Sequence, residues 1–116
     1  MKNIWKINGA ELELDVQDAD TMERYENAFS EMSKEEKEVP KDGKQSDRIR
    51  EYCKLYERLF DRIFGEGASE KIFKDLPKNT AIYDEIYFSF LDFIRSQIID
   101  SARNRAERLS KYRPKK

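Results

Sequence analysis

Apolar residues recur at helical spacing along most of the chain, and this pattern constrains the fold more than any other feature. The broadest stripe lies between residues 49 and 64, where the apolar side chains fall on one face of a helix. Its members are Ile49, Tyr52, Cys53, Tyr56, Leu59, Phe60, Ile63 and Phe64. We expect this helix to be the central element of the core, with Ser46 or Asp47 as its N-cap.

Narrower stripes predict two other long helices and one short helix. The first long helix should begin at Asp20, which can cap it together with Glu23 three residues later. A short helix capped by Ser69 should end before Pro77. The last helix should be capped by Thr80 and can run on past residue 102 toward residue 109. The stripes of the two long helices are Met22, Tyr25, Phe29 and Met32, and Ile82, Ile86, Phe90, Phe93, Ile94 and Ile98.

A different periodicity marks residues 2–16. Apolar residues alternate with polar ones on both sides of Asn8-Gly9, and that pair favours a two-residue hairpin turn because both residues accept a positive φ. We expect Leu12, Leu14 and Val16 to point inward. The polar, breaker-rich link over residues 39–44 should be a loop.

The sequence therefore predicts a mainly α fold, with a small N-terminal β-hairpin followed by a bundle of three longer helices and one short helix. A length of 116 residues indicates a single domain. We expect an acidic helical domain over residues 1–102, with the hairpin in residues 1–17. Residues 103–116 should form a basic C-terminal tail that can continue the last helix.

Charge is distributed unevenly between these two parts. The tail carries a net charge of +6, so the preceding residues carry −7 in a chain whose total is −1. Such a tail can contact phosphates, dock onto an acidic protein surface, complement a helix dipole, or only increase solubility. Nucleic acid is the weaker candidate, because the acidic body would repel it. The basic residues of interest are Arg103, Arg105, Arg108, Lys111 and Arg113.

Composition excludes several kinds of active site. The chain has no His, and its single Cys53 lies on an apolar stripe, so His-based catalysis and Cys-rich zinc sites are excluded. The carboxylates are interleaved with lysines or serve turns, which is typical of a solvated surface. We predict no catalytic, cofactor-binding or metal-binding residues. No apolar run is long enough for a membrane span or a signal peptide, which predicts a cytoplasmic protein.

We assign turn and cap roles to several glycines, and a binding role to aromatic residues of the last helix. Gly65-Glu66-Gly67 resembles part of a phosphate-binding loop but lacks its Gly-Lys-Ser/Thr ending, so we interpret it as a helix cap and turn. Gly9 and Asp20 are the corresponding turn and cap residues near the N-terminus. A single stripe cannot bury every aromatic residue of the last helix. The predicted protein-interface residues are Tyr83, Tyr87, Phe88 and Leu91.

Four segments of the sequence resemble one group of proteins. They are the hairpin Ile7-Asn8-Gly9, the junction Asp18–Glu26, the segment Phe60–Gly67 and the basic run Asn104–Arg108. These segments are similar to short tail-morphogenesis proteins of phages and prophages of Gram-positive bacteria, in particular tail assembly chaperones. That resemblance implies a non-enzymatic protein of the bacterial host cytoplasm. It would keep the tape-measure protein soluble while the tail tube assembles.

The resemblance also implies the partners. We expect tail proteins as partners, the tape-measure protein among them, together with self-association into a homo-oligomer and no membrane partner. Two alternatives remain open at this stage. One is a small nucleic-acid-associated regulator that uses the basic tail, and the other is a structural head-to-tail completion subunit. Loss of nucleic-acid binding with salt would identify the first, and retention in purified particles would identify the second.

Overall fold

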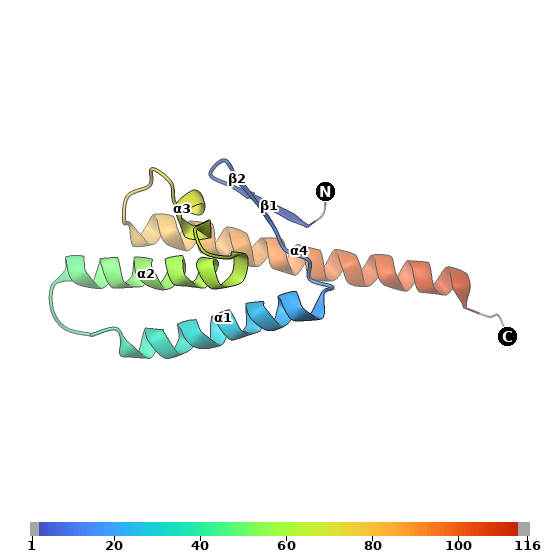
Figure 1. Cartoon of the computed structure of the whole chain (residues 1–116), viewed down its shortest axis with the longest axis horizontal. Helices are drawn as coiled ribbons and strands as arrows, with labels where there is room; N and C mark the ends of the chain where they lie inside the picture. Colours follow the sequence, from blue (N-terminus) through green and yellow to red (C-terminus); the bar gives the residue numbers. More distant parts are fainter. Residues whose placement is uncertain (1–2, 114–116) are drawn as a thin grey trace.

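A computed structural model describes residues 3–113 and contains a hairpin followed by helices (Figure 1). Strands β1 (Ile4–Ile7) and β2 (Ala10–Glu13) pair antiparallel, with Trp5 opposite Leu12. Helices α1 (Ala19–Glu38), α2 (Gln45–Phe64), α3 (Ala68–Ile72) and α4 (Thr80–Tyr112) follow. The predicted mainly α fold, with an N-terminal hairpin, three longer helices and one short helix, is confirmed.

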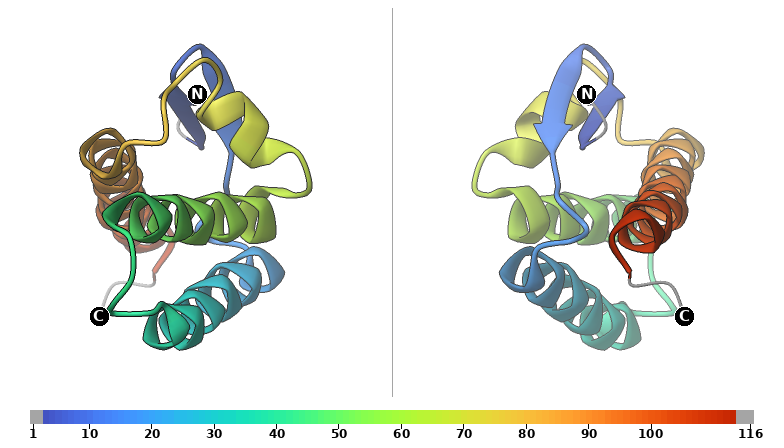
Figure 2. Two further views of the ribbon diagram at one scale, coloured as in Figure 1. Left: turned by 90° about the vertical axis from the view of Figure 1, so that its left-hand side faces the viewer. Right: turned by 90° about the vertical axis from the view of Figure 1, so that its right-hand side faces the viewer.

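Helix α2 lies in the middle of the molecule. Helix α1 packs against one side of it and runs antiparallel to it, whereas α4 packs against another side (Figures 1 and 2). The hairpin and α3 cover the side of α2 that lies away from α1 (Figure 2). The prediction that the broad stripe forms the central core element is therefore confirmed. Its fully buried members include Cys53, Leu59, Phe60 and Ile63.

The two-residue turn of the hairpin forms as the sequence predicts. Asn8 and Gly9 both have positive φ angles, 49° and 79°, which place the turn in the type I′ class. The Asn8 side chain has a second role, because its amide nitrogen donates to the carbonyl oxygens of Ile72 at 3.0 Å and Lys74 at 2.9 Å. One residue therefore sets the turn and attaches the hairpin to the end of α3.

Trp5 is the residue through which the hairpin joins the helices. Its ring stacks on Phe60 and Phe64 of α2, with centroid distances of 5.4 and 6.1 Å, and lies 5.1 Å from the ring of Phe90 on α4. The indole nitrogen donates to the Ser89 hydroxyl at 3.1 Å. Leu12 and Leu14 are buried beside it, and Val16 is half-buried, which agrees with their expected inward orientation.

Two predicted helix caps are displaced by one or two residues. Asp18, not Asp20, caps α1, because its carboxylate accepts the Thr21 backbone N–H at 2.9 Å. Asp20 lies in the first turn, where its charge complements the helix dipole. Likewise Asn79, not Thr80, caps α4, and its side chain accepts from the backbone N–H of Ile82 at 3.1 Å.

The other two cap predictions were also wrong. Helix α2 follows Lys44, whose side chain makes no capping bond, so Ser46 and Asp47 already lie inside the helix. Ser69 lies inside α3, because Gly67 occupies the N-cap position. The Asp61 carboxylate accepts the Ser69 backbone N–H at 2.8 Å and its hydroxyl at 3.1 Å. A side chain from α2 thus satisfies the start of α3.

Gly65 and Gly67 have the structural roles that the sequence predicts. Gly65 is the C-cap of α2, and its N–H donates to the Asp61 carbonyl oxygen. Its φ of 108° combined with ψ of 162° is a backbone conformation open essentially to glycine alone. Gly67 takes the left-handed conformation with φ of 91°. The two glycines make a sharp reversal between α2 and α3.

Helix α1 continues beyond its apolar stripe because an ion pair holds its last turns. The Arg62 guanidinium of α2 donates two hydrogen bonds to the Glu35 carboxylate, at 2.6 and 3.1 Å. Arg58 lies 3.8 Å from the same carboxylate. The Arg62 hydrogen bonds hold the pKa of Glu35 below its ordinary value. The expected link over residues 39–44 follows, and Val39 anchors it in the body.

The final helix extends beyond the body of the protein. Ile94 is the last α4 residue of the buried core, yet the helix continues to Tyr112 without interruption (Figure 1). The molecule is consequently elongated, at 68 × 29 × 22 Å. The basic segment expected after residue 102 is therefore helical over residues 103–112, and Lys115 and Lys116 lie outside the described residues.

Trp5→Ala should destabilise the protein by about 3–5 kcal/mol, because it removes a buried aromatic side chain from between three phenylalanine rings. Urea unfolding followed by circular dichroism measures this loss. Lys6→Ala on the same strand is the matched control, and it should change the free energy of unfolding by less than about 0.5 kcal/mol because Lys6 is exposed. Equal effects of the two substitutions would contradict the anchoring role of Trp5.

Candidate protein-binding site

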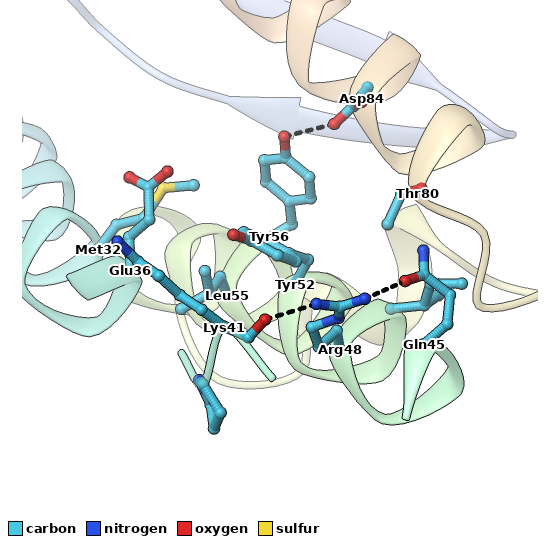
Figure 3. Close-up of a pocket in the computed structure, with 12 residues that line it drawn as sticks. Met32, Glu36, Lys41, Gln45, Arg48, Tyr52, Leu55, Tyr56, Thr80 and Asp84 are labelled. Atoms are coloured by element: carbon cyan, nitrogen blue, oxygen red, sulfur yellow. Dashed lines mark hydrogen bonds between the residues drawn. The ribbon is translucent and has the colours of Figure 1, made fainter. Parts of the chain in front are cut away.

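A cleft of about 650 Å³ opens where α1, α2 and α4 meet near the 39–44 link (Figure 3). Helix α2 supplies half of the lining residues, and the end of α1, the link and the start of α4 supply the rest. The lining combines apolar side chains with both signs of charge. Its residues are Met32, Glu36, Pro40, Lys41, Gln45, Arg48, Ile49, Tyr52, Leu55, Tyr56, Thr80 and Asp84.

Tyr56 joins the α2 and α4 walls of the cleft. Its hydroxyl donates to the Asp84 carboxylate at 2.6 Å, and Figure 3 shows the ring directed toward that residue. Behind it, the Tyr87 ring lies 4.9 Å from the Tyr56 ring. Burial, followed by the hydrogen bond to Asp84, raises the pKa of Tyr56 well above its ordinary value. The phenol proton is therefore held in the hydrogen bond to Asp84.

Arg48 attaches the link to the start of α2. Its guanidinium donates to the Lys41 carbonyl oxygen at 2.6 Å and to the Gln45 side-chain oxygen at 2.5 Å (Figure 3). These bonds give the mouth of the cleft a defined shape. Tyr52 stands at this mouth with 40% of its surface exposed. The cleft therefore presents an accessible aromatic ring beside hydrogen-bonding groups that are already oriented.

The four predicted interface residues do not form one surface. Tyr83 is fully buried and stacks on Phe73 with a centroid distance of 3.9 Å, so it is a core residue and is removed from the candidate set. Tyr87 supports the cleft from behind, and Leu91 is half-buried. Only Phe88 is exposed, with 51% of its surface accessible. Helical geometry turns neighbouring aromatic residues of α4 toward different sides.

Cys53 is buried against the core rather than placed in the cleft. Burial raises the pKa of its thiol, which keeps it protonated and poorly nucleophilic. Nearby, Tyr83 donates to the Glu57 carboxylate at 2.8 Å, and Lys78 pairs with the same carboxylate. Burial and the Glu57 hydrogen bond raise the pKa of Tyr83 to about 12. These interactions fasten the start of α4 to α2.

The five named basic residues lie along the exposed end of α4 and just after it. Arg103, Arg105, Arg108, Lys111 and Arg113 are all exposed, and Arg103 lies 3.7 Å from Asp100 of the preceding turn. They are remote from the cleft. Within residues 3–113, no group of three His, Cys, Asp or Glu side chains is placed to hold a metal ion. None of the helices described there has the length and apolar character needed to cross a membrane.

Sequence reasoning did not predict the cleft. Ile49, Tyr52 and Tyr56 belong to a stripe that the periodicity assigns to the core, and the link beside them gives no apolar signal. The missed signal is the width of the stripe. The elements that pack on α2 do not cover such a wide face along its whole length, so the first turns of the helix remain partly open.

Alkaline titration tests the environment of the tyrosines. Burial raises the pKa of Tyr25, Tyr56, Tyr83 and Tyr87 above the ordinary value of about 10. Because the folded state favours the protonated phenols, their contribution to the free energy of unfolding is complete below about pH 10. It is lost as the pH rises through the raised pKa values of the folded protein. We expect these four phenols to ionise late, together with a falling free energy of unfolding. Ionisation of all tyrosines around pH 10 in the folded protein, measured by ultraviolet absorbance, would contradict this environment.

Comparison with known proteins gives one match. Residues 8–116 match a family described as a family of unknown function (DUF6673). No curated protein and no solved structure matches the chain. The matched segment contains the hairpin turn, all the helices and every residue of the cleft.

Proposed function

The chain belongs to the DUF6673 family, and we propose that it is a non-enzymatic tail assembly chaperone that binds a helical segment of the tape-measure protein in the cleft. The cleft is the observation that carries the proposal. Its volume of about 650 Å³ suits a few side chains on one face of a helix. The resemblance of the hairpin, the start of α1 and the α2–α3 turn to phage tail-morphogenesis proteins supports the tape-measure protein as the client.

The chemistry of the cleft supports a binding role. Met32 and Ile49 offer apolar contact, and Met adapts its shape to different partners. Tyr52 can pack on an apolar client side chain while its hydroxyl bonds to a polar one. The Tyr56 hydroxyl donates to Asp84, so its oxygen can still accept a hydrogen bond from a client. An amphipathic helix would find both kinds of contact in this cleft.

The cellular setting follows from the same proposal. A chaperone of tail assembly would act in the cytoplasm of the bacterial host, where the tape-measure protein is made. It would leave the assembled particle, whereas a head-to-tail completion subunit would remain. Mass spectrometry of purified particles distinguishes these two roles.

A nucleic-acid-associated regulator is the second candidate function, and the exposed row of basic residues on α4 favours it. Duplex DNA binding that falls steeply with salt and disappears when residues 103–116 are deleted would identify this role. Client binding in the cleft should persist after that deletion, so the two functions are separable.

Tyr52→Ser should weaken client binding about tenfold or more, because a tyrosine that becomes buried in an interface commonly contributes about 2 kcal/mol. The chain is co-expressed with a tape-measure protein from a phage of Gram-positive bacteria, and the amount of soluble co-purified client is measured. Tyr112→Ser is the matched control, since this exposed tyrosine lies at the far end of α4. Equal recovery of client with both variants would refute binding in the cleft.

A further inference from the structure

Exposed apolar side chains are concentrated on α4. Of the five large apolar residues exposed among residues 3–113, Tyr52 lines the cleft and the other four lie on this helix. Ile98 and Ile99 are adjacent, with 46% and 48% of their surfaces accessible. Both come after Ile94, the last α4 residue of the core. The apolar patch therefore begins where the support of the body ends.

The projecting part of α4, residues 98–112, has little tertiary packing to stabilise it as a single helix. Isolated helices of about 15 residues are marginal in water, and most of their stability in proteins comes from packing. After Ile94, α4 contributes no residue to the buried core, and Figure 1 shows the helix running on past the ends of α1 and α2. The apolar α4 side chains that can contribute to a seam are Phe88, Ile98, Ile99, Ala102 and Leu109, which lie within one broad face of the helix. A partner helix would supply the missing contacts.

Charge along α4 specifies the partner and its direction. The half packed on the body exposes Glu85 and Asp92, whereas the projecting half exposes Arg103, Arg105 and Arg108. Two parallel copies of this helix would place like charges together. Two antiparallel copies would place the basic half of each beside the acidic half of the other, which is favourable and fixes the alignment.

We propose that α4 pairs antiparallel with α4 of a second copy of the chain, with Ile98 and Ile99 at the two-fold axis. At about 100° per residue, Asp92 and Arg103 project from the same flank of α4 on opposite sides of this pair of isoleucines, so Asp92 of one copy lies close to Arg103 of the other. Phe88 and Leu109 are equidistant from the two isoleucines along the helix, so Phe88 of one copy lies in the same layer as Leu109 of the other. The interface is isologous and closes on itself, so it yields a dimer and not a filament.

This inference deepens the proposed function by naming one of its partners, and it places that partner away from the cleft. Each dimer would carry two clefts, and two clefts on one particle bind a long helical client with higher avidity than one. Dimer formation needs no client. If client binding in the cleft fails, the dimer can still form, and if the dimer fails, the cleft can still bind the client.

Sedimentation velocity of the full chain over a range of concentrations tests the dimer. The wild type should sediment as a dimer, and Ile98→Gln with Ile99→Gln should sediment as a monomer with unchanged helical circular dichroism, because both side chains are exposed in the single copy. Tyr52→Ser is the control from the cleft and should dimerise like the wild type. A wild type that is monomeric throughout, or a dimer that survives the double substitution, would overturn the proposal.

Charge exchange tests the direction of pairing. Asp92→Arg or Arg103→Asp alone should weaken the dimer about tenfold, and the two together should restore it because the opposite charges again lie close together. Glu26→Arg on α1 makes the same change of charge elsewhere and should have no effect. Failure of the double variant to recover would overturn the antiparallel alignment. So would a monomer that binds a duplex DNA probe through the same arginines in place of pairing.

Discussion

The packing of Trp5 among Phe60, Phe64 and Phe90 is the interaction on which the rest of the structure depends. A two-stranded hairpin is marginal by itself, and α2 and α4 come from distant parts of the chain. One indole ring contacts both helices and joins them to the hairpin, while Asn8 attaches the same hairpin to α3. The hairpin, α2 and α4 therefore share one anchor, and α3 is joined to it through the hairpin.

This anchor leaves two faces without a partner. Because Trp5 and the Glu35–Arg62 ion pair draw the helices together toward the end of α2, the start of α2 is covered less completely and the cleft opens there. Because the body ends near Ile94, the second half of α4 projects into solvent with its isoleucines exposed. The two proposed binding surfaces, the cleft and the projecting half of α4, therefore lie where the core no longer covers the helices.

The sequence predicts the elements well and their edges less well. Periodicity locates the hairpin and the helices because apolar spacing reflects burial directly. Caps are displaced because several neighbouring residues can accept the same N–H, and tertiary contacts choose among them, as with Asp18 over Asp20. Burial of Tyr83 and the opening beside Tyr52 depend on which helices pack against α2 and α4, and no local pattern encodes that choice.

Hydrogen–deuterium exchange of the chain, measured with and without the tape-measure client, tests the central claim that the cleft binds a helical segment. Binding there should slow exchange in the 39–44 link and in the first turns of α2, around Arg48 and Tyr52, because these segments form the mouth of the cleft. Exchange that stays unchanged in those segments while the client is bound, with slowing confined to the projecting half of α4, would contradict the account.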